Sequence, residues 1–480
     1  MKQAECFYVD FHCHPALKPF GKSFNKTAGE NSDNSKSWNS IWHYNPPNLL
    51  KKGINYLFGL TKFSQANFTS ISKGNVGLVC VSLYPIEKWF LENKIKHRFS
   101  QQLLSNIATG IGMKRIKYLQ KIEDYFQDLQ AEYGFYQQLD KKTITIKGKK
   151  YNYKLIRSFD EYLKIARNPE PSCSTICVIM TIEGLHVLNT GLGKNPQEEE
   201  VLRNLTTIKQ WTFSPLYITF AHHFWNHLCG HAKSLDGFVA RNTDQSEGLN
   251  TGFTPLGMTV LEQMLSEETG RKILVDVKHM SATARYQYYQ WLQHHPKYAD
   301  TPVIVSHGAV NGLRSFFDQR LSDQPQAERF LKEDINFYDD ELILIAKSKG
   351  IFALQIDERR LTSKESLKKV KHALKRKNIL TYRSKLLWDQ IQYIAQLLDS
   401  NGMEAWNNIA LGTDFDGIIN PLNGIWTAED MPDLAFHLQE HAFNFLKENR
   451  LKLSDNYLPA QQIVQNVMKN NALAFIQRNY

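Results

Sequence analysis

The stretch Ile273-Leu274-Val275-Asp276-Val277-Lys278-His279 begins as an apolar run and ends in charged and polar residues. The run is rich in Val and Ile and does not alternate strictly, which is typical of a strand buried on both faces of a parallel sheet. The same pattern recurs along the chain. We interpret eight such runs as strands, at residues 6–11, 76–82, 175–181, 217–220, 273–277, 303–305, 351–355 and 408–411.

Helical patterns lie between several of these runs. Apolar residues recur at helical spacing in residues 258–268, 339–348 and 384–398. Strands that alternate with helices indicate βαβ units, and eight units favour an α/β fold of the (β/α)8 TIM-barrel type. An open, doubly wound sheet is the second possibility, but the sequence contains neither its GxGxxG signature nor a P-loop.

The spacing between the predicted strands is uneven. A barrel of this type uses about 250 residues, whereas this chain has 480. Residues 15–75 separate the first two runs, and residues 84–174 separate the second and third. The second interval begins helically and then alternates over residues 143–146 and 151–155 around a glycine, which predicts a β-hairpin. We therefore predict one barrel domain over residues 1–480, with insertions at 15–75 after strand one and 84–174 after strand two.

Composition excludes several classes of protein. A hydrophobic content of 42% is too high for a disordered chain, and a net charge of +10 is mild for this length and does not indicate nucleic-acid binding. The sequence has no long apolar run for a membrane span and no secretory signal in its first residues. Its six cysteines form no CxxC pair. These features favour a reducing, cytoplasmic location.

Side chains that can bind metal ions follow the predicted strands. His12 and His14 are two residues apart, so a strand would point both to the same side. Active sites of barrels lie at the carboxyl ends of the strands, where side chains from different strands converge. The residues found at these ends are His12 and His14 (first strand), Glu183 (third), His279 (fifth), His307 (sixth) and Asp414 (eighth).

This set of ligands contains nitrogen and oxygen but needs no cysteine. It favours a catalytic zinc or another divalent first-row ion over a structural zinc. Four histidines and a bridging carboxylate would hold two ions, which would lower the pKa of a bridging water to about 7 and polarise a scissile carbonyl. Asp414 is then a candidate to pass the proton of the attacking water to a leaving amine.

A second group of histidines competes with this interpretation. His223, His227 and His231 would share one face of a helix and could bind a metal there, but Gly230 interrupts the pattern. His222 closes the fourth predicted strand instead, and we expect its side chain to point into the site.

The chain resembles the membrane (renal) dipeptidase family, which comprises zinc-dependent barrels of the amidohydrolase superfamily. The resemblance covers most of the chain outside the two insertions. Its most specific piece is the string Gly-Thr-Asp-Phe-Asp-Gly at residues 412–417. The other matching segments are residues 10–15, 72–81, 182–184, 218–222, 276–281, 302–307 and 336–342.

The resemblance implies a role for each residue of the site. His222 would contact the carbonyl or tetrahedral oxygens of the substrate, and Asp414 would be the general acid and base. The implied metal ligands are His12 and His14 for the first ion, His279 and His307 for the second, and Glu183 as the bridge. The family also implies a dipeptide or related small amide as substrate, two Zn²⁺ ions and a possible homodimer.

The chain departs from the family pattern at two positions. The family has Asp where this chain has His14, which makes the site less negative by one charge. It also has Arg, which helps to hold the carboxylate of the substrate, where this chain has Ile335 before Asn336. Ile cannot form the bidentate hydrogen bonds that an Arg gives a carboxylate. The residues that could replace this Arg are Arg314, Arg320, Arg359 and Arg360.

Three functions follow from these residues. The first is a binuclear metal-dependent hydrolase that cleaves an amide or peptide bond in a small, dipeptide-like substrate. The second keeps the metals but catalyses another reaction of the superfamily, such as deamination or the hydrolysis of a cyclic amide or lactone. The third is a non-catalytic binding protein on the same fold, which would have no need of so complete a set of ligands.

Overall fold

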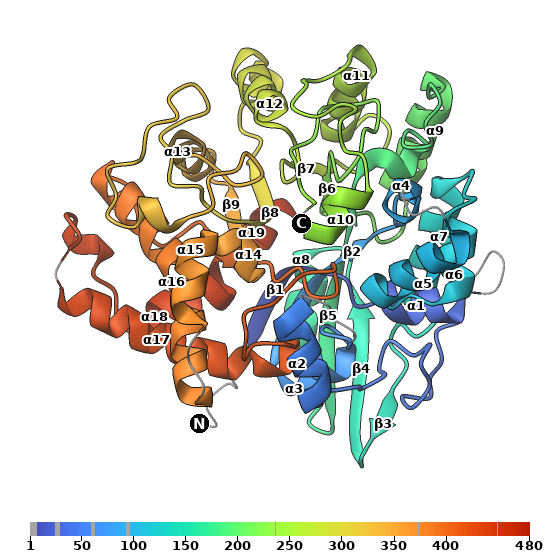
Figure 1. Cartoon of the computed structure of the whole chain (residues 1–480), viewed down its shortest axis with the longest axis horizontal. Coiled ribbons are helices and arrows are strands. Elements are labelled where there is room, and N and C mark those ends of the chain that lie inside the picture. The colour runs from blue at the N-terminus through green and yellow to red at the C-terminus, as the bar shows by residue number, and fades with distance from the viewer. Residues whose placement is uncertain are drawn as a thin grey trace.

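The computed structural model describes residues 7–24, 29–58, 63–92, 97–235, 237–371, 375–448 and 450–480. Within these residues, eight parallel strands form a nearly closed barrel (Figure 1). In barrel order they are β1 (Tyr8–Cys13), β2 (Val76–Leu83), β5 (Cys173–Glu183), β6 (Tyr217–Thr219), β7 (Leu274–Asp276), β8 (Ile304–Gly308), β9 (Ile351–Leu354) and β10 (Ile409–Leu411). The predicted (β/α)8 barrel is confirmed, and each predicted run overlaps one strand, although Cys6 lies outside the described residues.

Helices connect and surround these strands. The three predicted helices are confirmed as α11 (Pro255–Leu265), α13 (Asp339–Lys347) and the long α16 (Arg376–Ser400). The other helices that follow β5 are α9 (Glu198–Lys209), α10 (Gly237–Asn242), α12 (Ala282–His294), α14 (Glu358–Leu361), α15 (Lys364–Val370), α17 (Met431–Lys447), α18 (Ala460–Gln465) and α19 (Asn471–Asn479). Within the described ranges, none of the helices combines the length and apolar character that crossing a bilayer requires.

The first and last strands of the barrel meet at the end where the predicted metal ligands lie. Here the backbone N–H of Asp414 donates to the carbonyl of His12 at 2.9 Å. The buried carboxylate of Asp10 accepts hydrogen bonds from the backbone N–H and the hydroxyl of Thr413 at 2.9 and 2.6 Å. These contacts hold the loop after β10 against the end of β1.

The interior of the barrel is an apolar core, which α19 covers at the amino-terminal ends of the strands. Alternate strand residues such as Phe11, Cys80 and Ile179 point into it, because successive side chains of a strand face opposite sides. Phe475 and Ile476 of α19 belong to the same core, and the ring of Phe475 meets that of Phe11 edge-on at 5.7 Å. With the amino-terminal ends of the strands sealed in this way, the polar site lies at the opposite, carboxyl-terminal end.

The two long intervals contain helices and one hairpin. Residues 15–75 contain α1 (Leu17–Ser23), α2 (Leu49–Phe58) and α3 (Phe68–Lys73). Residues 84–174 contain α4 (Lys88–Leu91), α5 (Arg98–Thr109), α6 (Met113–Leu119), α7 (Tyr125–Gln137), α8 (Phe159–Arg167) and a hairpin of β3 (Ile144–Ile146) and β4 (Lys149–Leu155). The predicted hairpin is confirmed. However, β4 also pairs in parallel with β5, so the hairpin extends the barrel sheet.

A buried ion pair joins α12 to α13. The guanidinium of Arg285 donates to the carboxylate of Glu341 at 2.7 and 3.0 Å, and the two side chains are 1% and 0% exposed. An Arg285→Met variant leaves the Glu341 charge buried without its partner. We expect its free energy of unfolding, measured by urea denaturation, to fall by about 3–5 kcal/mol.

A matched control comes from the exposed pair of Arg320 and Asp318, in which the arginine side chain is 74% exposed. The Arg320→Met variant is expected to lose less than about 1 kcal/mol. Equal losses in the two variants would contradict the prediction.

Candidate metal centre

The predicted ligands meet in space at the carboxyl end of the barrel. His12 lies in β1 and His14 directly follows it, Glu183 ends β5, His279 lies in the loop after β7, and His307 lies in β8. All five are buried. Their ligand atoms form two groups, each within 4.8 Å: one of His12, His14 and Glu183, the other of Glu183, His279 and His307. The carboxylate of Glu183 belongs to both groups.

The distances place this carboxylate between two pairs of imidazoles. The two Nε2 atoms of each pair, His12 with His14 and His279 with His307, are 3.1 Å apart. Glu183 Oε2 lies 3.1 Å from His14, while its Oε1 lies 3.3–3.6 Å from the Nε2 atoms of the other three. Gly184 allows the chain to turn directly after Glu183, since its φ is +91° and a Cβ there would lie 2.4 Å from the ring of His186.

Hydrogen bonds to the far ring nitrogens determine which nitrogen carries the proton. His14 Nδ1 lies 3.0 Å from the carbonyl of Ser82, which can only accept. His307 Nδ1 lies 2.8 Å from the hydroxyl of Ser306, and this hydroxyl donates to Asp276 at 2.6 Å. In both cases Nδ1 is therefore the donor, and the Nε2 lone pair is directed at the centre of the cluster.

The same reasoning applies to His12. Its Nδ1 lies 3.3 Å from the hydroxyl of Tyr217, which donates to the carbonyl of Phe11 at 2.6 Å. Three imidazole lone pairs and a carboxylate thus face one another in a buried space, where they repel unless a cation lies between them. Nitrogen and oxygen donors in this arrangement fit a divalent ion such as zinc.

The pKa values of the clustered residues also indicate that the cluster favours a positive charge at its centre. Although burial opposes ionisation, the neighbouring histidines His222 and His14 hold the pKa of Glu183 well below its usual value. Burial also works against a charged His14, but the Glu183 and Asp414 carboxylates raise its pKa to about 10, so that without a metal ion a proton on Nε2 supplies the positive charge. Burial lowers the pKa of His279 and of His307 well below the ordinary value. These two histidines therefore stay neutral, which is the form that binds a metal.

Asp414 lies at the edge of this cluster. Its Oδ1 is 3.5 Å from His14 Nε2 and 4.0 Å from His12 Nε2. Burial and the nearby Glu183 raise its pKa, which brings the protonated form within reach. Its backbone has a φ of +58°, a strained conformation for a non-glycine residue that is typical of functional sites.

The other aspartate of the same string has a different environment. The Asp416 carboxylate accepts hydrogen bonds from Lys18 at 2.6 Å and from the backbone N–H groups of Gln65 and Ala66 at 2.9 Å. All three donors belong to the segment between β1 and β2. Asp416 therefore fastens this segment to the loop that carries Asp414.

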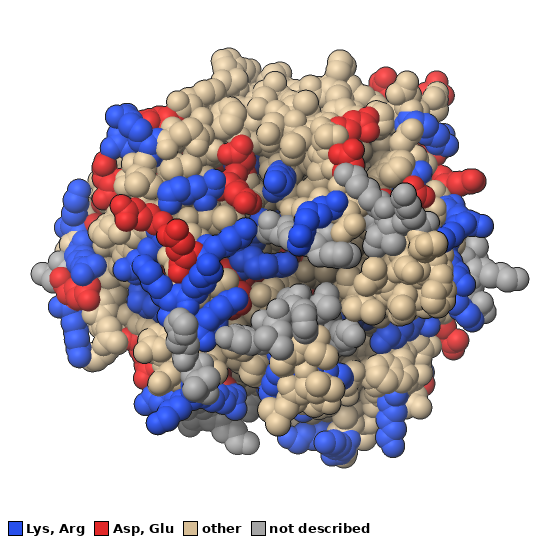
Figure 2. Space-filling view, viewed as in Figure 1, with Lys and Arg blue, Asp and Glu red and all other residues tan. Residues whose placement is uncertain are grey.

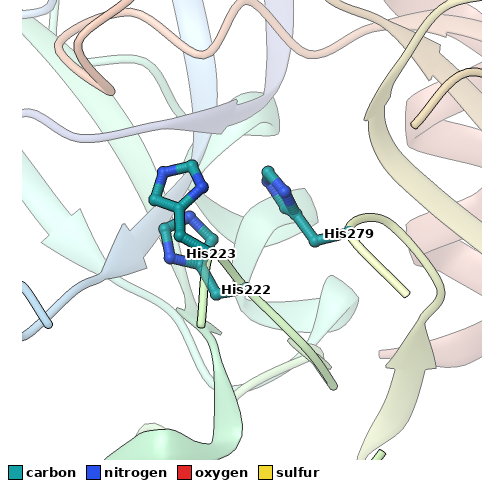
Figure 3. Close-up of side chains that lie close together, drawn as sticks. All are labelled: His222, His223 and His279. Carbon is teal, nitrogen blue, oxygen red and sulfur yellow. The ribbon is translucent and has the colours of Figure 1, made fainter. Parts of the chain in front are cut away.

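His222 also faces the cluster, as the sequence predicted for its strand end. Its Nε2 lies 3.6 Å from Glu183 Oε1, and its Nδ1 donates to the carboxylate of Glu87 at 2.8 Å. Burial opposes a charge on His222, but Glu87 and Glu183 raise its pKa. Figure 3 shows His222 and its neighbour His223 opposite His279, and the rings of His222 and His279 are 4.6 Å apart.

The sequence analysis did not identify Glu87 as part of the site. Glu87 is buried and also accepts a hydrogen bond from the hydroxyl of Tyr84 at 2.8 Å and one from the backbone N–H of His223 at 3.1 Å. Its position four residues after the end of β2, like that of the other strand-end residues, is the signal that could have found it.

Replacing Glu87 by Gln tests its role as a positioning residue for His222. The hydrogen bond to Nδ1 loses its charged acceptor, and a hydrogen bond to a charged group contributes about 1.5–3 kcal/mol. We expect kcat to fall about 10- to 100-fold, with bound metal unchanged by elemental analysis. The exposed Glu170→Gln variant is the control. A loss of metal together with activity would instead place Glu87 among the residues that support the ligands.

The histidines of the competing cluster do not form a second site. Residues 223–231 are not helical, and His227 has a φ of +58°. His231 Nε2 lies 2.9 Å from the carbonyl of Glu247. Within the described residues, His223 is the one member of this cluster whose ligand atom lies close to others, namely those of His222 and His279. It therefore belongs to the same centre, a place that the sequence analysis did not give it.

Four arginines could replace the Arg that the family has at the position of Ile335, and of these Arg360 is buried. The side chains of Arg314, Arg320 and Arg359 are 38%, 74% and 39% exposed and pair with nearby aspartates. Arg360 is 9% exposed, pairs with Glu333 at 3.2 Å, donates to the carbonyl of Ser234, and interacts electrostatically with His223.

Comparisons with known proteins show which family the chain matches. The model of the membrane dipeptidase family (peptidase family M19) matches residues 42–474. The fold is similar to that of the probable dipeptidase PvdM from Pseudomonas aeruginosa, with 12% identity, 99% of this chain and 96% of that chain covered, and a TM-score of 0.51. A metallopeptidase from Rhodobacter sphaeroides, liganded with a phosphinate mimic of the dipeptide L-Ala-D-Ala, has 11% identity, 99% coverage of both chains and a TM-score of 0.47. No curated protein sequence matches the chain significantly.

Proposed function

Because the chain belongs to the membrane dipeptidase family and is a metal-dependent, dipeptidase-like hydrolase, we propose that it cleaves the peptide bond of small dipeptides with two bound Zn²⁺ ions. His12 and His14 would hold one ion, His279 and His307 the other, and Glu183 would bridge them. The observation that carries this proposal is the buried set of Nε2 lone pairs directed at one carboxylate, which needs cations to be stable.

The roles of the remaining residues follow from their surroundings. When bound, the two ions would supply Lewis acidity at the scissile carbonyl and lower the pKa of a water molecule to about 7. Asp414 takes the proton of the attacking water and delivers it to the leaving amine. His222, kept charged by Glu87, donates from Nε2 to the substrate oxygen as negative charge develops there.

We also propose that residues 1–480 form one barrel domain in which the segments 15–75 and 84–174 wall the site. The contact of Lys18 with Asp416 supports this, because it ties the first segment to the loop of Asp414. A homodimer and a cytoplasmic location are further proposals, which analytical ultracentrifugation and cell fractionation test directly.

Metal reconstitution followed by a substrate screen tests the function. The purified protein is stripped with a chelator, reloaded with Zn²⁺, Mn²⁺ or Co²⁺, and assayed on a panel of dipeptides, cyclic amides, lactones and aminated bases. We expect two equivalents of metal and turnover of dipeptides only, with both lost in His12→Ala. Turnover restricted to another class would replace the dipeptidase reaction, and metal without any turnover would favour a binding protein.

A further inference from the structure

Within the described part of the chain, Lys278 is a buried amine without an anionic partner, and it directly precedes the proposed ligand His279. The residue is 2% exposed, and its side chain forms one hydrogen bond, a long one of 3.5 Å from Nζ to the carbonyl of Ile335. Among the residues that the structure describes, no carboxylate forms an ion pair with it. A buried ammonium group without a partner is costly, so its retention here points to an anion that arrives from outside the chain.

The charges around this amine place it at the site. Lys278 interacts electrostatically with Asp414 and, repulsively, with Arg360. The neutral ligands His279 and His307 are also within its electrostatic range.

Arg360, whose guanidinium also pairs with Glu333 at 3.2 Å, supplies a second positive group at this place. It comes from α14, after β9, and reaches the carbonyl of Ser234, whose hydroxyl lies 2.7 Å from His223 Nδ1. Figure 2 shows Lys and Arg side chains gathered near the hollow in the middle of this face. The last turns of α14 and α15 carry Arg359, Lys368 and Lys369.

The geometry of a dipeptide requires such a group close to the reacting bond. Its terminal carboxylate is separated from the scissile nitrogen by a single Cα, so the group that binds this carboxylate must lie beside the proposed metal centre. Lys278 fits this requirement, because it precedes the proposed ligand His279 and its buried Nζ lies 3.5 Å from the carbonyl of Ile335, the position at which the family has its Arg.

We propose that Lys278, with Arg360 beside it, binds the terminal carboxylate of the substrate and so makes the site specific for unblocked dipeptides. The inference rests on the proposed function. It assigns to a lysine on the loop after β7 the task that the apolar side chain at Ile335 cannot perform.

A pair of substrates that differ only at this carboxylate tests the proposal. KM and kcat are measured for L-Ala-L-Ala and for its carboxyl-terminal amide, with the zinc-loaded wild type and the Lys278→Met variant. We expect the variant to raise KM for the free acid about 10- to 100-fold, the value of a hydrogen bond between charged groups. Values for the amide should change less than about threefold, so that the preference for the acid disappears.

Two further variants separate recognition from a structural role. Lys278→Arg keeps the positive charge and should retain the preference for the acid. Lys272→Met removes a half-buried lysine, bonded to Thr301 at 3.3 Å, that precedes the same strand, and should leave both substrates unaffected. Equal losses on acid and amide in Lys278→Met would overturn the proposal.

The same experiment distinguishes a failure of the proposed function from a failure of the proposal on Lys278. A wild type that hydrolyses neither compound refutes the proposed function. In that case calorimetric titration of the same pair into wild type and Lys278→Met decides whether Lys278 binds a carboxylate, since only an acid-specific loss of affinity supports it.

Discussion

Replacing Glu183 by Gln is expected to remove most of the bound metal and to lower kcat by about 10³-fold or more, the equivalent of several kcal/mol of lost charge stabilisation. Gln has the same shape but no charge, and Glu183 is the carboxylate that both histidine pairs share. Without it, the negative charge that remains beside the imidazoles is that of Asp414 at the edge of the cluster. Elemental analysis after dialysis and steady-state kinetics measure the two effects.

The control for this variant is Glu268→Gln, since the Glu268 side chain is 82% exposed. It should keep full metal content and activity. A Glu183→Gln protein that retains two equivalents of metal and normal kcat would show that the cations bind elsewhere, and the assignment of all five ligands would then be wrong.

Replacing Asp414 by Asn is expected to lower kcat about 10²- to 10⁴-fold while the metal content stays unchanged. Asn preserves the size of the side chain and its backbone N–H bond to His12, but it cannot accept and release a proton. The expected pattern therefore differs from that of Glu183→Gln, in which metal and activity fall together. Kinetics and elemental analysis on the same preparation separate the two.

The exposed Asp433→Asn variant is a suitable reference, because its partner Arg376 lies on the surface. If Asp414→Asn kept kcat within about threefold of wild type, a different residue would have to carry the proton. His14, whose pKa the surrounding carboxylates raise, would be the next residue to test.

The barrel could be predicted because its strands are buried on both faces, which leaves short apolar runs in the sequence. The ends of these strands were predicted less accurately than their positions in the sequence. β1 extends to Cys13, past the end of its apolar run, because a strand that closes a barrel continues through the polar residues of the site. The pairing of β4 with β5 was not predicted, since a hairpin pattern shows the turn but not the neighbour of its outer strand.

The site was predictable where residues sit at the ends of strands, because the barrel topology brings those ends together. It was not predictable where contacts depend on loops. Glu87 and His222 are 135 residues apart and meet only because β2, β5 and β6 are adjacent in the sheet. Lys278 looks like an ordinary charged residue in the sequence, and its importance became clear only from its burial.

The helix α19 below the barrel has a consequence for biosynthesis. Its residues Phe475 and Ile476 complete the same core as Phe11, so the interior stays open until α19 has left the ribosomal exit tunnel. The junction of β10 with β1 imposes a similar delay, since Thr413 must reach Asp10. The nascent chain therefore carries apolar strands without the helix that covers them until α19 has been made.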